Sequence, residues 1–388
     1  MEQKEFMTSR ERVQAAINFR IPDRVPIDLG GFQTGIHKKA YIELLKYLGR
    51  EEEIIMLDNV QQLVKPSEEV LELFHVDIRY VTAKGPKDFD CSIRMNFRKG
   101  ELWHDLTDEF GIVWSMPDKQ QLFMDISHHP LADADIRDLD YYPFPDGGDP
   151  SRFRGLKEEA GRLRNDTTYA ISTGIGGVVY ETCWYMRGLE IWFTDMLVNP
   201  GFCEALLDKI LKFWLDYYSG FMKEIGDLID IVMIGDDLAG QTGPLFSPEF
   251  YRAIVKPRQK KLVQHIKSLT GAKIWYHTCG GAIEFIPDLL DNGIHILNPV
   301  QITAAGMDPK NLKETFGKKL VLWGGGIDSQ HVLPFAKPNK VKEDVRKNLE
   351  IFKPGGGYIF NNVHNIQAGV PPENIIAMFE AAYQYGFY

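Results

Sequence analysis

Several features that would indicate a secreted or nucleic-acid-binding protein are missing from this 388-residue sequence. Cysteine is scarce, with only four residues spread over the chain, which does not suggest a disulfide framework. Positive charge is also low: the formal net charge is −10, and no lysine- or arginine-rich run occurs. Because phosphate binding needs clustered positive charge, nucleic acid is not expected as a partner.

Long apolar stretches are absent as well. No window approaches the roughly 18 consecutive apolar residues of a membrane-spanning helix, and the N-terminal residues lack the apolar core of a secretory signal. We therefore expect a cytoplasmic protein without a membrane segment. Hydrophobic residues make up 44% of the chain and charged residues 25%, an ordinary globular composition. The length allows one large domain or two or three small ones.

Short apolar segments alternate with stretches whose apolar residues recur at helical spacing. The segments expected to be strands are 25–29, 77–81, 169–174, 229–234, 274–277, 296–299, 320–323 and 358–360. The expected helices are 38–49, 67–74, 186–199, 201–225, 248–269, 282–291, 308–316, 340–352 and 372–386. Eight strand candidates in this rhythm predict a (β/α)8 TIM barrel, an α/β fold. An open doubly wound sheet is the alternative, but no Gly-x-Gly-x-x-Gly turn follows the first strand.

One segment breaks the rhythm. Residues 91–116 alternate polar and apolar side chains around two glycine-containing turns, so we expect an antiparallel β-hairpin or small sheet inserted into the barrel. The remainder of the chain continues the barrel pattern on both sides of it. We therefore predict a single barrel domain over residues 1–388.

Polar side chains collect where the predicted strands end. In a barrel of this kind the catalytic groups lie at the carboxyl ends of the strands and in the loops that follow. Here these positions hold metal-capable and hydrogen-bonding residues while the strand bodies stay apolar, which is typical of an active site. The candidates are Asp28, Phe32, Glu181, Asp236, Asp237, His277, Cys279, Asn298, Gln301, Asn361, Asn362 and His364.

The tripeptide His277-Thr-Cys279 carries the clearest chemistry. Alternate residues of a strand face the same side, so the imidazole and the thiol converge and form half of a transition-metal site, with zinc as the favoured ion. The alternative is a buried cysteine beside a hydrogen-bonded histidine. His364 is the best third ligand, with a substrate-binding imidazole as its alternative. Two histidines, one cysteine and an open position match a catalytic zinc site.

The other candidates allow more than one interpretation. Asp236 and Asp237 could be a general base and its orienting partner, carboxylates that fix a ligand histidine, or helix caps. Glu181 is a candidate catalytic residue that could supply a fourth metal ligand, or it could interact only with a helix dipole. Asn298, Gln301, Asn361 and Asn362 are candidate substrate-binding residues. Phe32 and other aromatic residues could line a cleft or belong to the core.

Several motifs resemble the uroporphyrinogen decarboxylase superfamily. They are Gly235-Asp-Asp-Leu-Ala-Gly-Gln-Thr-Gly-Pro-Leu-Phe-Ser-Pro248, Trp323-Gly-Gly-Gly-Ile-Asp328, and Gly357-Tyr-Ile-Phe-Asn-Asn-Val-His-Asn-Ile366 followed by Pro371-Pro-Glu-Asn-Ile375. Residues 9–18 and 22–27 are similar to the first helix and first strand of that family. The resemblance implies a TIM barrel with an N-terminal helical extension.

The superfamily has two main branches, and the motifs divide between them. The decarboxylases bind porphyrinogen carboxylates through an arginine-rich loop after the first strand. The corresponding loop of this chain, Gly30–His37, contains no arginine. The corrinoid-dependent methyltransferases share the His-x-Cys pair, but they complete their zinc with a cysteine where this chain has His364, a residue that resembles the decarboxylases.

The closer branch implies a zinc-dependent methyltransferase of anaerobic one-carbon metabolism. It would move a methyl group between cobalamin, carried by a corrinoid protein partner, and a small thiol, pterin or methoxy or methylated substrate. A homodimer is also consistent with the resemblance. The alternatives are a metal-free lyase resembling uroporphyrinogen decarboxylase, in which Asp236 or Asp237 and His364 stabilise a protonated intermediate, and a non-catalytic corrinoid or tetrapyrrole binder.

Overall fold

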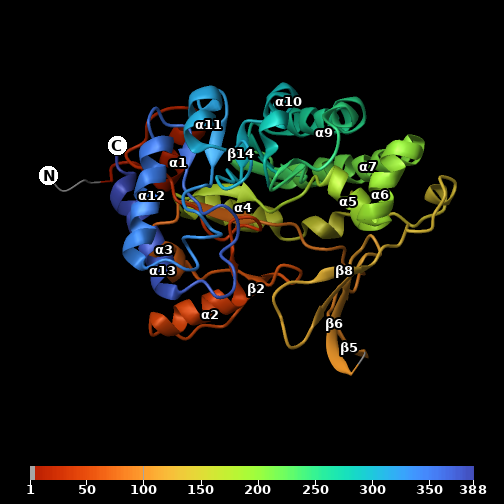
Figure 1. The fold of residues 1–388 in the computed structure, drawn as a ribbon, viewed down its shortest axis with the longest axis horizontal. Helices are drawn as coiled ribbons and strands as arrows, with labels where there is room; N and C mark the ends of the chain where they lie inside the picture. The colour runs from red at the N-terminus through yellow and green to blue at the C-terminus, as the bar shows by residue number, and fades with distance from the viewer. Residues whose placement is uncertain (1–4, 99) are drawn as a thin grey trace.

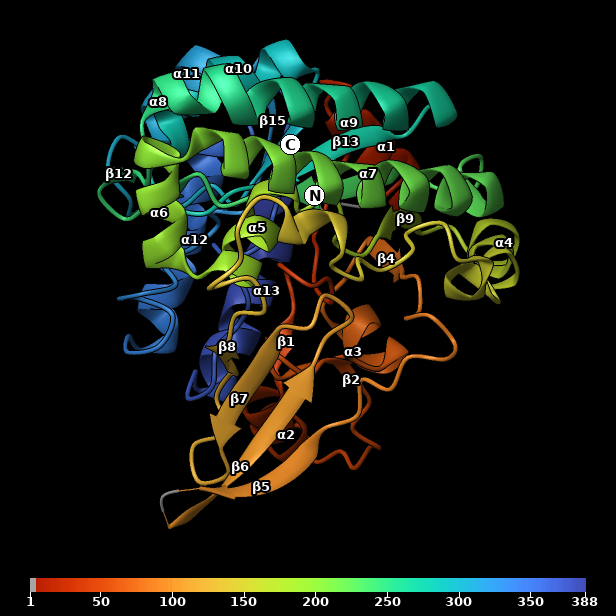
Figure 2. The same cartoon turned by 90° about the vertical axis from the view of Figure 1, so that its right-hand side faces the viewer.

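The computed structural model describes residues 5–98 and 100–388. Its centre is a seven-stranded sheet in the order β16-β15-β14-β13-β10-β9-β4, and every neighbouring pair is parallel. Helices cover its outer side, as Figures 1 and 2 show. The strands are β4 (Ile78–Val81), β9 (Ala170–Thr173), β10 (Ile231–Gly235), β13 (Lys273–His277), β14 (Ile296–Asn298), β15 (Val321–Trp323) and β16 (Tyr358–Ile359).

The first predicted strand closes this sheet into a barrel without being a regular strand. Residues 25–29 lie between β16 and the start of β4. On one side the Asp28 amide donates to the Phe360 carbonyl over 3.0 Å, and on the other the Asp77 amide donates to the Ile27 carbonyl over 2.8 Å. Pro26 has no N–H to donate, which shortens the ladder to an isolated bridge. The chain therefore adopts the predicted barrel, with one strand reduced to this bridge.

Most predicted helices occur near their expected bounds. They are α2 (Lys38–Tyr47), α3 (Glu68–Leu73), α7 (Pro200–Ile225), α10 (Ile286–Asn292), α11 (Pro309–Phe316), α12 (Pro338–Phe352) and α13 (Pro372–Gly386). The predicted helix 186–199 corresponds to α6 (Leu189–Val198) but starts too early, because a separate helix, α5 (Val179–Arg187), ends before Gly188, whose φ of +90° is outside the helical range. The helix α4 (Leu156–Asp166) was not predicted.

The predicted helix 248–269 is interrupted as well. It consists of the short α8 (Pro248–Phe250), a π-helical turn over Tyr251–Val255, and α9 (Lys256–Leu269). The π-helical turn precedes Pro257, which has no N–H and whose ring disturbs the preceding turn of an α-helix. None of the helices in the described part of the chain combines the length and the apolarity needed to span a bilayer.

The insertion is a small sheet, one of the two forms expected for it, and it extends beyond the predicted segment 91–116. It is a four-stranded antiparallel sheet in the order β5-β6-β7-β8 that projects from the barrel (Figures 1 and 2). Its strands are β5 (Arg94–Arg98), β6 (Glu101–Thr107), β7 (Val113–Pro117) and β8 (Asp125–His128). A small sheet that the sequence did not indicate consists of β1 (Ile36–His37), β3 (Leu63–Val64) and β2 (Met56–Asp58).

The barrel interior is filled by apolar side chains. The inner core cluster includes Ile231 and Met233 of β10, Trp275 of β13 and Trp323 of β15, and the two indole rings stack 4.2 Å apart. The amino-terminal helix α1 (Ser9–Ile17) contributes Val13, Ala16 and Ile17 to the same cluster and so plugs one end. Side chains alternate along a strand, so His277, two residues after Trp275, also faces the barrel interior but lies nearer the carboxyl end of β13. The polar residues therefore form the layer above the apolar core.

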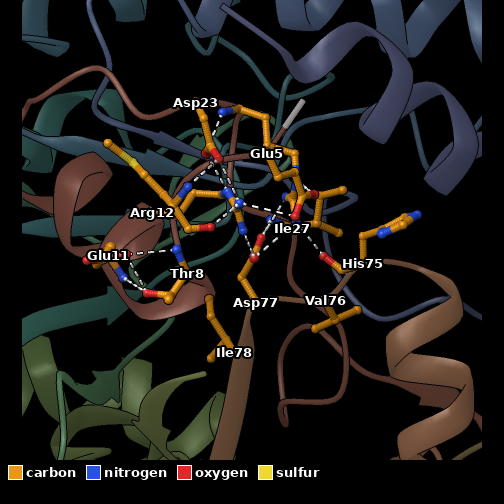
Figure 3. Close-up of polar contacts among 12 residues, drawn as sticks. Glu5, Thr8, Glu11, Arg12, Asp23, Ile27, His75, Val76, Asp77 and Ile78 are labelled. Atoms are coloured by element: carbon orange, nitrogen blue, oxygen red, sulfur yellow. Dashed lines mark hydrogen bonds and ion pairs between the residues drawn. The ribbon is translucent and has the colours of Figure 1, made fainter. Parts of the chain in front are cut away.

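A buried ion-pair network ties the plugged end together, as Figure 3 shows. The carboxylate of Asp77, which precedes β4, forms ion pairs with Arg12 Nη1 of α1 over 2.7 Å and with Arg24 Nη1 over 2.8 Å. Arg12 also pairs with Asp23 over 2.7 Å. Burial alone would raise the pKa of Asp23, but the Arg12 guanidinium and the Phe6 and Met7 amides outweigh it and lower that pKa. The network joins α1, the closing segment and β4.

Candidate metal centre

Three ligand-type side chains meet at the carboxyl end of the barrel. His277 ends β13, Cys279 follows two residues later, and His364 comes from the loop after β16. One ligand atom from each lies within 4.8 Å of the other two. The His277 Nε2 and Cys279 Sγ atoms are 3.4 Å apart, and the two imidazole rings meet edge to face with centroids 5.4 Å apart. His277 is buried, while Cys279 and His364 are half-buried at the barrel mouth.

Two glycines allow the chain to bring these ligands together. A Cβ at Gly235 of β10 would lie 2.8 Å from His277 Cβ, so a larger residue would push the two strands apart. Gly280 has a φ of +81°, and a Cβ there would lie 2.5 Å from the Ala239 and Gly240 carbonyl oxygens. The sharp turn after Cys279 therefore requires glycine.

Asn298 fixes the orientation and tautomer of His277. The two residues are Cα partners in the β13–β14 pairing. Asn298 Nδ2 donates to the Trp323 carbonyl over 3.2 Å, so Asn298 Oδ1, 2.6 Å from His277 Nδ1, is the acceptor. His277 Nδ1 then carries the proton, and Nε2 keeps its lone pair on the side of Cys279. Burial lowers the pKa of His277 to about 4, which keeps the ring neutral as metal binding requires.

Asn298 was predicted to bind substrate, but its contacts give it a positioning role. We expect Asn298→Leu to weaken zinc binding about 10–100-fold, because His277 loses the acceptor that orients it. Asn298→Asp should restore affinity, since a carboxylate also accepts from Nδ1. Competition with a chromophoric chelator measures both affinities. Equal zinc affinity in the wild type and the leucine variant would contradict this role.

Asp237 lies beside the three ligands, whereas Asp236 faces a helix. Asp237 Oδ1 accepts from the Cys279 amide over 2.6 Å and lies 4.0 Å from His277 Nε2. Asp236 Oδ1 accepts from the Tyr180 and Glu181 amides over 2.7 and 3.0 Å, and its Oδ2 accepts from Gln259 over 2.8 Å. Burial raises the pKa of both carboxyl groups, that of Asp236 to about 7. These contacts favour helix capping for Asp236 and a place within the site for Asp237.

Glu181 is a candidate proton carrier. It lies in the first turn of α5, and Tyr185 OH, one turn later, donates to its Oε1 over 3.0 Å. Burial, then the charges of Asp237 and Asp236, raise the pKa of Glu181 well above its usual range. Trp114 of the inserted sheet packs edge to face on Tyr185, with ring centroids 5.3 Å apart. The insertion thus supports a residue at the barrel mouth, which the sequence did not indicate.

The other predicted residues lie at the same end of the barrel with different contacts. Gln301 Oε1 accepts from the Gly280 amide over 2.7 Å and so stabilises the turn after the ligands. Asn361 Nδ2 donates to the Asp28 carbonyl over 2.9 Å. Asn362 is fully buried, and Phe32 is half-buried and lies against Gly174. The structure thus brings the three ligand candidates together, with Glu181 and Asp237 beside them.

Two contributing residues were missed by the sequence reasoning. Gln259 of α9 holds Asp236, and no local pattern marks it. The contact of Tyr185 with Glu181 was not predicted, although their i, i+4 spacing on one helix could have indicated the hydrogen bond.

Comparisons place this barrel in a known family. Residues 94–385 match the family model described as uroporphyrinogen decarboxylase (URO-D), and the chain belongs to that family. The uroporphyrinogen decarboxylase of Ruthia magnifica subsp. Calyptogena magnifica is 28% identical over 195 residues, 49% of this chain and 51% of that protein. The methylcobamide:CoM methyltransferase MtbA of Methanosarcina mazei is 26% identical over 200 residues, 51% of this chain and 54% of that protein.

The fold has a counterpart among solved structures. A methyltransferase from Methanosarcina mazei superposes with a TM-score of 0.65 at 17% identity, covering 98% of this chain and 99% of that one. Identity this low supports the shared fold alone. The curated matches above extend over only about half the length of the relatives. The chain is thus a member of an enzyme family that includes both decarboxylases and a methyltransferase.

Proposed function

We propose that this protein is a zinc-dependent methyltransferase that works with a corrinoid protein. It would move a methyl group between that partner's cobalamin and a small thiol, pterin or methoxy or methylated substrate. The observation that carries the proposal is the convergence of His277, Cys279 and His364 within 4.8 Å at the barrel mouth. The name of the Methanosarcina relative, a methylcobamide:CoM methyltransferase, supports the same class of reaction.

The donor set fits zinc. With bond lengths of about 2.0–2.3 Å, neighbouring donors around a tetrahedral zinc lie roughly 3.5 Å apart. The 3.4 Å between His277 Nε2 and Cys279 Sγ matches this spacing. Two imidazoles and one thiolate leave a fourth position for substrate, as in catalytic zinc sites. Burial, Asp237 and Glu181 raise the pKa of the Cys279 thiol, so a bound cation is what would keep it as thiolate.

The chain's own residues supply orientation and proton handling. When bound, zinc provides Lewis acidity, which lowers the pKa of a thiol or makes a methoxy oxygen a better leaving group. Asn298 holds the His277 ring, and Asp237 holds the Cys279 backbone. Burial and neighbouring carboxylates raise the pKa of Glu181, and Tyr185 holds its side chain, so it can deliver a proton to a departing oxygen. With a thiol substrate the ionised Glu181 could instead accept the proton.

Metal content and methyl transfer test the proposal together. We expect protein purified without added metal to contain about one zinc per chain, because the three donors form a single site. We also expect the protein to demethylate methylcobalamin in the presence of a small thiol, and the absorbance change of the corrinoid measures this reaction. Absence of bound zinc in the wild-type protein would contradict the proposed function.

A second candidate is a metal-free decarboxylase, favoured by the family match and by the names of several relatives. In that case His364 and Asp237 would act on an acidic, pyrrolic substrate. The absence of arginine from Gly30–His37 argues against it, because several substrate carboxylates would remain unpaired. Conversion of uroporphyrinogen to coproporphyrinogen by metal-free protein would favour this candidate over the methyltransferase.

A further inference from the structure

Two buried hydrogen-bond acceptors at the barrel mouth lack a donor. Among the residues that the structure describes, Asp28 Oδ1 and Asn361 Oδ1 have no hydrogen-bond partner, and both side chains are fully buried. Buried polar atoms in folded proteins are nearly always paired, so an unpaired one requires an explanation such as a ligand or water. Asn361 Nδ2 donates to the Asp28 backbone carbonyl, which joins the Asn361 side chain to the backbone of Asp28.

The contacts of the remaining atoms identify both free atoms as acceptors. Asp28 Oδ2 receives the Tyr80 hydroxyl over 2.9 Å and the Trp323 indole N–H over 3.1 Å, which leaves Oδ1 as the free oxygen. A backbone carbonyl can only accept, so the Asn361 nitrogen must face Asp28 and its oxygen must be the free atom. The next residue, Asn362, is buried, and neither its amide oxygen nor its amide nitrogen has a partner among the described residues. It can therefore pair with a hydrogen-bond donor or with an acceptor.

This pair belongs to the same end of the barrel as the metal ligands. Trp323, whose indole contacts Asp28, also accepts through its carbonyl from Asn298, the residue that holds His277. Asn361 precedes His364 by three residues in the loop after β16. These contacts place the two acceptors at the same end of the barrel as the proposed metal position.

Among the described residues, carboxyl groups without a lysine or arginine partner gather at this end of the barrel. Asp28, Glu181, Asp236 and Asp237 all lie there, and none forms an ion pair with a lysine or arginine in the described part of the chain. Burial raises the pKa of Asp28 to about 7, so an arriving cation would readily ionise it. An anionic group placed beside Asp28, away from the metal position, would find no lysine or arginine to pair with among the described residues.

We propose that the substrate of this site carries a hydrogen-bond donor, an ammonium or a hydroxyl group, which binds Asp28 Oδ1 and Asn361 Oδ1 while its thiol or methoxy end occupies the metal position. The inference rests on the proposed methyltransferase function and narrows its substrate class. It excludes anionic thiols such as 2-mercaptoethanesulfonate as preferred substrates.

Three thiols with one carbon skeleton and different charges test this inference. Calorimetric titration of the zinc-loaded protein with 2-mercaptoethylamine, 2-mercaptoethanol and 2-mercaptoethanesulfonate gives their dissociation constants, and the three-carbon homologues repeat the series at a longer reach. We expect the amine to bind at least about tenfold more tightly than the sulfonate, because a charge-assisted hydrogen bond replaces a repulsion. The hydroxyl compound should fall between them.

The Asp28→Asn variant separates recognition from general damage. It should weaken binding of the amine about tenfold and change binding of the alcohol much less, because the neutral amide still accepts a hydrogen bond. Glu343→Gln, on exposed α12, removes the same charge far from the site and should leave all three constants unchanged. The inference would be overturned if the wild-type protein bound the sulfonate as tightly as the amine, or bound none of the thiols. An equal loss of affinity for all three thiols in Asp28→Asn would also overturn it.

Failure of this inference can be distinguished from failure of the proposed function. If the protein binds zinc at the expected amount but shows no preference among the three thiols, the proposed substrate class is refuted and the proposed metal site is retained. If the protein holds no zinc, 2-methoxyethylamine and 1-methoxypropane, which need no thiolate, are titrated into the metal-free protein. A preference for the amine that Asp28→Asn removes would then support the acceptor site without the methyltransferase.

Discussion

Replacing Cys279 with alanine should remove most of the bound zinc and lower methyl transfer by about a thousandfold or more. The estimate follows from the several kcal/mol that a catalytic metal contributes, at 1.36 kcal/mol for each factor of ten in rate. The remaining ligands, His277 and His364, would leave the ion with two protein donors, which is fewer than catalytic zinc sites have. Zinc analysis and initial rates with methylcobalamin measure the two effects.

Matched variants make the result specific. Cys91→Ala removes an exposed cysteine just ahead of the inserted sheet and should retain zinc and activity. His364→Cys offers a thiolate at the third position and should keep the metal, whereas His364→Ala should lose it. Retention of full zinc occupancy in Cys279→Ala would show that the metal, if present, is held elsewhere.

The second large effect concerns stability at the opposite end of the barrel. Asp77→Ala should destabilise the protein by about 3–5 kcal/mol, because two buried guanidinium groups, those of Arg12 and Arg24, would lose their shared carboxylate. The Asp77 side chain also accepts from the Ile27 amide over 2.8 Å, so the closing segment would lose a contact too. Urea unfolding followed by circular dichroism gives the change.

An exposed pair serves as the control for this stability effect. Asp135 and Arg137 lie 2.8 Å apart at the surface, and Asp135→Ala should leave the unfolding midpoint unchanged, because solvent screens exposed ion pairs. Equal midpoints for the wild type and Asp77→Ala would mean that the buried network contributes nothing net. A shift in Asp135→Ala as large as that in Asp77→Ala would contradict the role assigned to burial.

The sequence was sufficient for the barrel and for the residues at its mouth. The alternation of apolar strands and amphipathic helices predicts parallel strands, and the carboxyl ends of such strands meet at one end whatever their exact bounds. His277 and Cys279 share a face because of local periodicity, which a sequence displays directly. The meeting of His364 with this pair follows from the barrel topology and the family resemblance.

Other features depend on contacts that no local pattern records. The role of Asn298 requires the register that pairs it with His277, and a shift by one residue would turn its side chain away. The raised pKa of Glu181 depends on burial among carboxylates from another strand. The insertion was underestimated because β8 (Asp125–His128) is short and largely exposed, so its side chains show no clear apolar alternation.

The isolated bridge that closes the barrel also constrains how the chain folds. It joins Ile27 to Phe360, residues separated by most of the polypeptide, and a second bridge joins Ile36 to Ile366. Contacts between such distant residues carry a large loop-closure entropy and form late. During synthesis the chain can form this closure only after residues near 360 have emerged. Because His364 lies in the same late segment, barrel closure and the meeting of the three candidate ligands depend on the same part of the chain.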